Sequence, residues 1–210
     1  MSRVRKMRAR RMGRPRREDR PPGATREQLL EAAAEVFSEQ GYVGASIHAI
    51  ADRAGVTSGA LYKHFESKAD LLLHVVERAV HGIPLSEKLA AGGRTTSRFF
   101  SQLVSAYADP SLRRLRRLAI EIHAAASRDE EAAELLLAFN ERTRAALRER
   151  LESGIASGAI SPALDLAQTA SLLLVFVMGL AHLDTLEPSL VGDAGWIRFV
   201  ERSVARLLPP

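Results

Sequence analysis

The stretch AIADRAGVTSGALYKHF, residues 49–65, constrains the fold most, because it ends one short helix and begins another after about three residues. Ala51 is small enough to let a second helix cross closely, and Gly55 is free to adopt the left-handed conformation that ends a helix. Val56 then fills the angle between the helices, and Leu61 anchors the second helix to the core. This spacing is typical of a helix-turn-helix; the alternative is two core helices joined by a tight turn.

The rest of the chain also has the pattern of helices, with no convincing strand. Capping boxes at Thr25–Gln28 and Ser67–Asp70 predict two helix starts. The longest apolar run, Leu172 to Leu183, is too short to span a bilayer, so we expect no membrane segment. We predict an all-α protein of about nine helices. Four lie before residue 84, and the other five lie at about 95–108, 111–127, 130–157, 165–184 and 193–208. The helix at 111–127 is expected to turn four arginines largely outward, namely Arg113, Arg114, Arg116 and Arg117.

Charge is distributed unevenly along the 210 residues. Residues 1–26 contain eleven Lys or Arg and two acidic residues, whereas the remainder carries an excess of acid. Residues 1–23 lack the large apolar side chains that a core needs, so we predict a disordered basic arm. Such a block favours polyanion binding, and the alternative is a solubilising tail. The chain has no cysteine, and no apolar stretch follows the arm. We therefore expect a cytoplasmic protein without a signal peptide, disulfides or thiolate metal sites.

Three pieces of sequence, AAAEVFSEQGY, AIADRAGVTSGALYKHF and SKADLL, make residues 24–83 similar to the DNA-binding domain of TetR-family transcriptional regulators. The resemblance implies a three-helix DNA-binding head, with its motif at about 46–65, joined by a fourth helix to an all-helical body. That body, residues 84–210, would bind a small-molecule effector and form a homodimer through the helices at about 165–184 and 193–208. Replacing Phe199 and Val204 by Asp should then give monomers; the alternative is that either residue is core, in which case the variant unfolds.

The same resemblance assigns DNA contacts to individual residues. Two of them, Ser46 and Thr57, equally suit plain helix N-caps, and Gly59 suits a simple close approach to DNA. The candidates are the phosphate contacts Ser46, Tyr62 and Lys68, the base- or backbone-facing Thr57, Ser58, Gly59 and Lys63, and His64, which stands where many relatives have another aromatic residue.

The arm adds two further candidates. Gly13-Arg14-Pro15-Arg16 resembles the core of an AT-hook, in which an extended Gly-Arg-Pro segment lies along the minor groove. Arg14 and Arg16 would suit the strong negative potential of narrow A-T tracts.

A ligand pocket in the body would be lined mainly by apolar and aromatic residues. His123 and His182 would be its few polar groups, and the effector would be apolar or amphipathic. No cofactor is implied. Plain core packing is the alternative for most of the apolar candidates, which are Phe99, Phe100, Leu103, Tyr107, Phe139, Phe176 and Met178.

Enzymatic chemistry has little support in the sequence. There is no metalloprotease, P-loop, nucleophile-elbow or dinucleotide-binding motif. Glu121 with His123, and His182 with Asp184, come closest to acid-base or metal pairs, but residues two apart on a helix point in different directions. We predict a ligand-controlled repressor of an inverted-repeat operator in double-stranded DNA. The alternatives are a protein that coats nucleic acid non-specifically through its arm and, more weakly, a helical enzyme.

Overall fold

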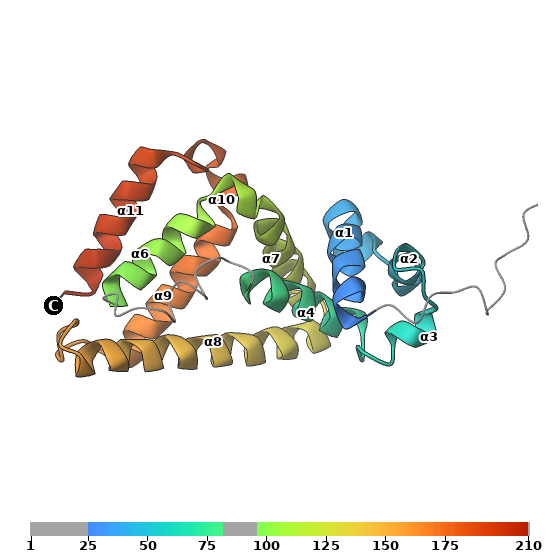
Figure 1. Cartoon of the computed structure of the whole chain (residues 1–210), viewed down its shortest axis with the longest axis horizontal. Coiled ribbons are helices and arrows are strands. Elements are labelled where there is room, and N and C mark those ends of the chain that lie inside the picture. The colour runs from blue at the N-terminus through green and yellow to red at the C-terminus, as the bar shows by residue number, and fades with distance from the viewer. Residues whose placement is uncertain (1–24, 82–95, 210) are drawn as a thin grey trace, which may run out of the picture.

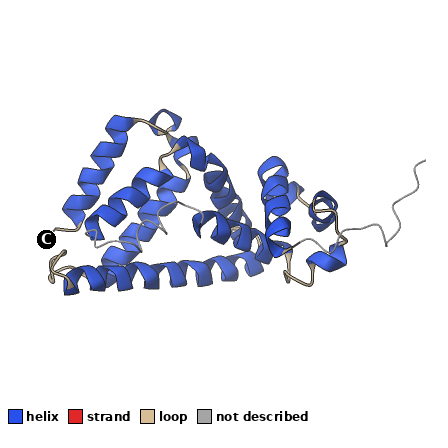
Figure 2. Cartoon of the chain, viewed as in Figure 1, coloured by secondary structure: helices blue, strands red, loops and turns tan. Residues whose placement is uncertain are grey.

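The computed structural model describes residues 25–81 and 96–209 (Figure 1). Within these two ranges the chain is helical and contains no β-strand, which confirms the all-α class (Figure 2). In chain order the elements are α1 (Arg26–Gly44), α2 (Ile47–Arg53), α3 (Ser58–Leu61), α4 (Lys68–His81), α6 (Thr96–Tyr107), the 3-10 turn η2 (Pro110–Leu112), α7 (Arg113–Ala126), α8 (Glu130–Ala156), α9 (Leu166–Ala181), α10 (Leu183–Leu186), the 3-10 turn η3 (Pro188–Leu190) and α11 (Ala194–Leu207).

The described part of the chain has ten α-helices instead of about nine, because the helix predicted at 165–184 is divided. His182 leaves helical geometry at φ −94° and ψ 5° and ends α9. The His182 carbonyl then accepts the amides of Thr185 and Leu186, both at 2.9 Å, and this begins α10. No helix in the described ranges is long and apolar enough to cross a bilayer.

The start of α1 and the turn between α2 and α3 match their sequence signals. Thr25 and Gln28 form the predicted capping box, with the Thr25 amide 2.8 Å from the Gln28 side-chain oxygen. Gly55 is left-handed at φ 71°, which allows the chain to leave α2 at once. Val56 and Leu61 are 9% and 0% exposed. The helix-turn-helix packing that the spacing predicts is therefore present.

Near its end α1 is kinked at a glycine. Gly41 has φ 69° and produces a kink, and the helix continues to Gly44. The turn that follows leads to Ser46, the N-cap of α2. This left-handed glycine therefore changes the direction of α1 before the chain reaches the helix-turn-helix.

One hydrophobic core joins the head to the body. Phe37 of α1 and Leu71 of α4 are at most 1% exposed, and Leu118 and Ile122 of α7 belong to the same cluster. Burying a side chain of this size stabilises the fold by about 1.5–3 kcal/mol. Helix α7 packs on both α1 and α4 (Figure 1). The predicted boundary between head and body at residues 83 and 84 lies outside the described residues.

A second core fills the body between α6, α7, α8, α9 and α11. Helix α6 contacts both α9 and α11, and α8, the longest of the described helices, packs against α9 (Figure 1). On α11, Val200 and Val204 face this core and are 2% and 1% exposed, whereas Phe199 is 55% exposed. Val204 is therefore a core residue, and Asp at this position is expected to unfold the protein because the change would place a carboxylate in the core.

The arginines of α7 also differ from the prediction. Arg113, Arg114 and Arg117 are exposed as expected, but Arg116 is 0% exposed. It lies four residues after Leu112, on the inner side of the helix. The body therefore contains a fully buried guanidinium.

Candidate DNA-binding surface and body site

Helix α3 and the turn that follows it present a short polar surface above buried apolar residues. Leu61 and Phe65 are 0% and 1% exposed beneath it. Thr57 caps the helix, with its hydroxyl accepting an amide three residues on at 3.2 Å. Tyr62 is 54% exposed, so its phenol is available to a partner. The remaining candidates on this side are half-buried Ser58 and exposed Gly59, Lys63 and His64.

Two predicted phosphate contacts also have structural roles. Ser46 is exposed and caps α2 through the amide of Ala49 at 3.1 Å. Lys68 is half-buried, and its ammonium donates to the carbonyls of Tyr42 at 2.8 Å and Ala45 at 3.1 Å. The same ammonium lies 4.3 Å from the centroid of the Tyr42 ring. Lys68 therefore fastens the start of α4 to the end of α1, and its contact with phosphate stays a prediction.

An ion-pair cluster that the sequence did not indicate holds α2 on α1. Arg53 contacts Glu35 and Glu39, each at 2.8 Å. The Arg53 guanidinium lowers the pKa of the Glu39 carboxyl, chiefly by donating a hydrogen bond to it. The partners lie 14 and 18 residues apart in the sequence, so local spacing carries no signal for them.

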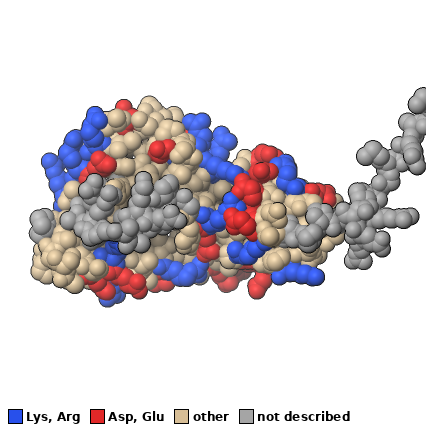
Figure 3. Space-filling model, in the orientation of Figure 1, with Lys and Arg blue, Asp and Glu red and all other residues tan. Residues whose placement is uncertain are grey.

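Acidic and basic side chains alternate over the face of the head and α7 that Figure 3 shows. Where the head meets the body, Glu31 of α1 pairs with Arg78 of α4 and Arg114 of α7. Hydrogen bonds from these arginines lower the pKa of the Glu31 carboxyl. The sequence places its excess of basic residues in residues 1–26. Arg14 and Arg16 belong to that segment and lie outside the described residues.

Most of the predicted ligand-lining residues pack into the second core. Phe100 and Tyr107 are 1% and 4% exposed, and burial raises the pKa of the Tyr107 hydroxyl to about 12. Phe99 meets Phe100 edge-on with ring centroids 4.9 Å apart. Leu103, Phe176 and Met178 are partly buried against the same cluster, and Phe139 of α8 is 9% exposed. Their role in a ligand pocket stays a prediction.

His123 and His182, the two polar groups predicted for the pocket, are in contact although they are 59 residues apart in the sequence. His123 Nδ1 lies 3.3 Å from His182 Nε2, and the rings are stacked with centroids 5.5 Å apart. Burial lowers the pKa of His123, and the charge of His182 lowers it further. The pair joins α7 to the end of α9. Within the described residues, no group of three or more His, Cys, Asp or Glu side chains is arranged to hold a metal ion.

Buried Arg116 forms a second junction close to the end of α9. Its Nε contacts Asp184 at 2.5 Å, and its Nη1 donates to the carbonyls of Tyr107 at 2.6 Å and Asp109 at 2.8 Å. Arg113 binds the same carboxylate from the exposed side at 3.2 Å. The hydrogen bond from Arg116 lowers the pKa of the Asp184 carboxyl. This junction fixes α7 to α10 and to the end of α6.

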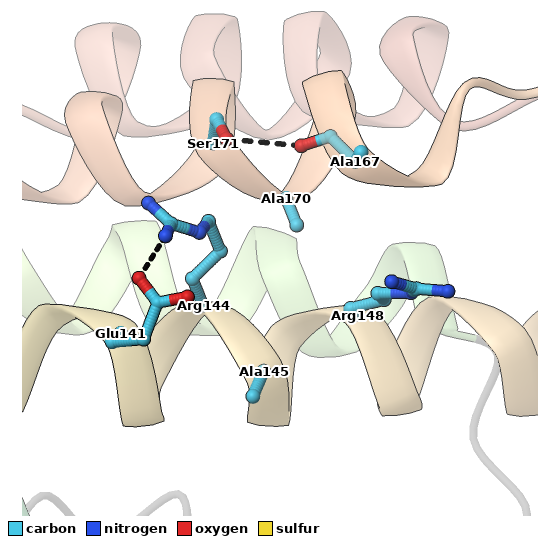
Figure 4. A pocket seen from close by; sticks show the side chains of 7 residues that line it. All are labelled: Glu141, Arg144, Ala145, Arg148, Ala167, Ala170 and Ser171. Atoms are coloured by element: carbon cyan, nitrogen blue, oxygen red, sulfur yellow. Dashed lines mark hydrogen bonds and ion pairs between the residues drawn. The ribbon is translucent and has the colours of Figure 1, made fainter.

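A hollow of about 190 Å³ lies between α8 and α9 (Figure 4). It is smaller than the roughly 300–1,000 Å³ of typical ligand pockets. Arg144 and Arg148 of α8 line the hollow, and Arg144 pairs with Glu141. None of the nine residues predicted to bind a ligand lines it.

A helix-turn-helix with an exposed polar recognition helix, joined to a helical body, defines the class of DNA-binding transcriptional regulators. The family profile described as bacterial regulatory proteins of the tetR family matches residues 29–75. A second profile, the BetI-type transcriptional repressor C-terminal region, matches residues 95–209. The chain therefore belongs to the TetR family, with a BetI-type C-terminal region, and it is not an enzyme.

Individual proteins support the same family. The transcriptional regulator UidR of Escherichia coli K12 is 29% identical over 167 residues, covering 74% of this chain and 79% of UidR. The transcriptional activator FasR of Mycolicibacterium smegmatis is 44% identical over 78 residues, covering 37% of this chain; the match spans about a third of the length of FasR, 36%.

Solved structures share the fold. A TetR-family regulator from Rhodococcus sp. superposes with a TM-score of 0.75 at 19% identity, covering 88% of this chain and 98% of its own. FadR from Bacillus subtilis, in complex with stearoyl-CoA, superposes with a TM-score of 0.62 at 22% identity, covering 87% and 97%.

Proposed function

We propose that this regulator is a ligand-responsive repressor that binds an inverted-repeat operator as a homodimer. The observation that carries the proposal is the surface formed by α3 and the turn that follows it, where Tyr62 and Lys63 are exposed next to buried Leu61. A recognition helix needs short donors for base edges and longer ones for phosphates. Because the proposed target is double-stranded DNA, we expect the protein to act in the cytoplasm.

The test is enrichment of random duplex DNA by the full chain, followed by footprinting on the enriched fragments. We expect protection of two half-sites related by two-fold symmetry, one helical turn or a multiple of it apart. Protection that spreads evenly along any duplex would instead support the alternative of a protein that coats nucleic acid through its basic arm.

Exposed apolar residues on α9 and α11 support the dimer. Leu172 and Val175 on α9 are 51% and 67% exposed, and Phe199 on α11 is 55% exposed. The Phe199 ring stacks on Trp196 with centroids 5.9 Å apart. Large apolar side chains grouped on exposed helix faces mark interaction surfaces, and a two-fold dimer would bury the same face on both copies.

We expect Leu172→Asp with Phe199→Asp to give a folded monomer with weak, half-site DNA binding. Leu186→Asp is the matched control, because Leu186 is 68% exposed on α10, outside both helices. Sedimentation gives the mass and circular dichroism gives the helix content. A doubly substituted protein that stays dimeric would place the interface elsewhere.

An apolar or amphipathic effector in the body is the last part of the proposal. The supporting observation is the supply of aromatic residues around α6, including Phe99, Phe100 and Tyr107. FadR in complex with stearoyl-CoA indicates that this fold is compatible with an amphipathic ligand. Native mass spectrometry of the purified protein should detect a copurifying small molecule, and adding that molecule should lower operator affinity. A molecule that raises operator affinity would make the protein a corepressor-dependent regulator.

A further inference from the structure

A carboxylate of the body binds the backbone at the end of α1. Glu121 of α7 accepts the backbone N–H of Tyr42 at 2.6 Å, across 79 residues of sequence. At Gly41, whose φ is 69°, an added Cβ would lie 3.2 Å from the same carboxylate. The kink in α1 therefore provides both the free amide and the space that Glu121 occupies.

The turn that Glu121 holds is also tied to α4. Tyr42 offers its carbonyl to the Lys68 ammonium, and Ala45 offers a second carbonyl. Ser46, which caps α2, follows immediately. One chain of contacts thus runs from α7 through Glu121 and the turn at residues 41–46 to Lys68, at the start of α4.

Besides the hydrophobic core that they share, two polar contacts join α7 to α1 in the described residues. The second link is Arg114 to Glu31 at 2.8 Å, seven residues before Glu121 and so about 10 Å away along α7. Its two side chains are each 43% exposed, and exposed ion pairs contribute little. Glu121 binds a backbone amide that does not move independently of its helix, and hydrogen bonds to charged groups are among the stronger ones.

We propose that Glu121 is a positioning residue for DNA binding. Its carboxylate sets the turn at residues 41–46, and with it the orientation of α2 and α3 relative to the body. This role rests on the proposed function, because it concerns the fixed placement of two heads on two half-sites. Without the carboxylate the turn keeps only its contacts with Lys68 and the core, and operator binding must then restrict the added motion.

The variants are Glu121→Ala, which removes the acceptor, Glu121→Gln, which keeps a neutral acceptor, and Arg114→Ala as the matched control on the same two helices. Operator fragments enriched by the unsubstituted chain are the probe, with a scrambled duplex as the non-specific reference. We expect Glu121→Ala to weaken operator binding about tenfold, Glu121→Gln to recover most of that loss, and Arg114→Ala to change binding less than about twofold. Scrambled-duplex binding should stay unchanged in all three.

Hydrogen exchange at the Tyr42 amide is the direct readout of the contact. Exchange should accelerate in Glu121→Ala and remain slow in Glu121→Gln and Arg114→Ala, at similar melting temperatures. Fast Tyr42 exchange with undiminished operator affinity would overturn the positioning role. Equal loss in Glu121→Ala and Arg114→Ala would also overturn it. Failure of the unsubstituted chain to enrich any DNA would instead overturn the proposed function, and this role with it.

Discussion

Removing the carboxylate of Asp184 tests how far the free energy of unfolding falls when the buried guanidinium of Arg116 loses its partner. Arg116 is 0% exposed, and its Nη2 has no hydrogen-bond partner. In Asp184→Ala the charge would rest only on the carbonyls of Tyr107 and Asp109. Breaking a buried pair by removing one partner costs about 3–5 kcal/mol. For a chain of this size that corresponds to a fall in melting temperature of about 6–20 °C.

Arg113 provides the matched control, because it binds the same carboxylate from a side chain that is 59% exposed. Arg113→Ala should therefore cost less than about 1 kcal/mol. Thermal and urea unfolding followed by circular dichroism would measure both variants at one fixed protein concentration, since a dimer's stability depends on concentration.

A double variant shows whether a large loss of stability in Asp184→Ala comes from the buried charge that is left unpaired. Arg116→Met with Asp184→Ala removes the buried charge together with its partner, so it should be less destabilised than Asp184→Ala alone. Equal costs for Asp184→Ala and Arg113→Ala would refute the reasoning. The reasoning would also be refuted if the double variant lost as much stability as Asp184→Ala and Arg116→Met lose when made separately and added together.

Three further predictions concern the head, the body and the arm. Tyr62→Phe should weaken binding to all DNA sites similarly and leave the preferred sequence unchanged, because a phenol that donates to phosphate reads no bases; repeated enrichment would reveal a changed preference. Burial lowers the pKa of His123 in the folded protein, so on acidification the unfolded chain takes up this proton first. The free energy of unfolding should therefore fall as the pH drops below about 6.5, until the folded His123 is also protonated. Urea midpoints measured between pH 5 and 8 should depend less on pH in His123→Gln than in the unsubstituted protein. A dimer without residues 1–20 should lose roughly 5 units from the slope of log affinity against log salt, if about three basic residues per arm bind phosphate; identical slopes in salt titrations would leave the arm as a solubilising tail.

Local signals were sufficient where the physical cause is itself local. The Thr25–Gln28 capping box satisfies amides within one turn of the helix, so its residues identify it without any knowledge of the fold. Gly55 ends α2 because a left-handed residue is needed there. The recognition helix was also predictable from local sequence, because Val56 and Leu61 are buried against other residues of the same motif. The head was therefore predictable from one continuous stretch of sequence.

The run of four arginines favours an outward Arg116, although its spacing from Leu112 indicates the inner side of the helix. The partner that makes its burial tolerable, Asp184, lies 68 residues away in the sequence. The divided helix at His182 is similar, because the helix breaks where the chain must turn towards α11. Such features depend on which elements meet in space, which the local pattern does not contain.

The contact between Glu121 and Tyr42 shows the same limit at the point where the body meets the head. A glycine at position 41 predicts a helix end, but it does not reveal that a carboxylate from α7 fills the space beside it. Once the kink is formed, the half-buried Tyr42 amide needs an acceptor, because leaving a donor unpaired away from water is costly. The glycine and the distant glutamate therefore depend on each other physically. A substitution at either position should disturb the turn that leads to Ser46, and through it the placement of α2 and α3.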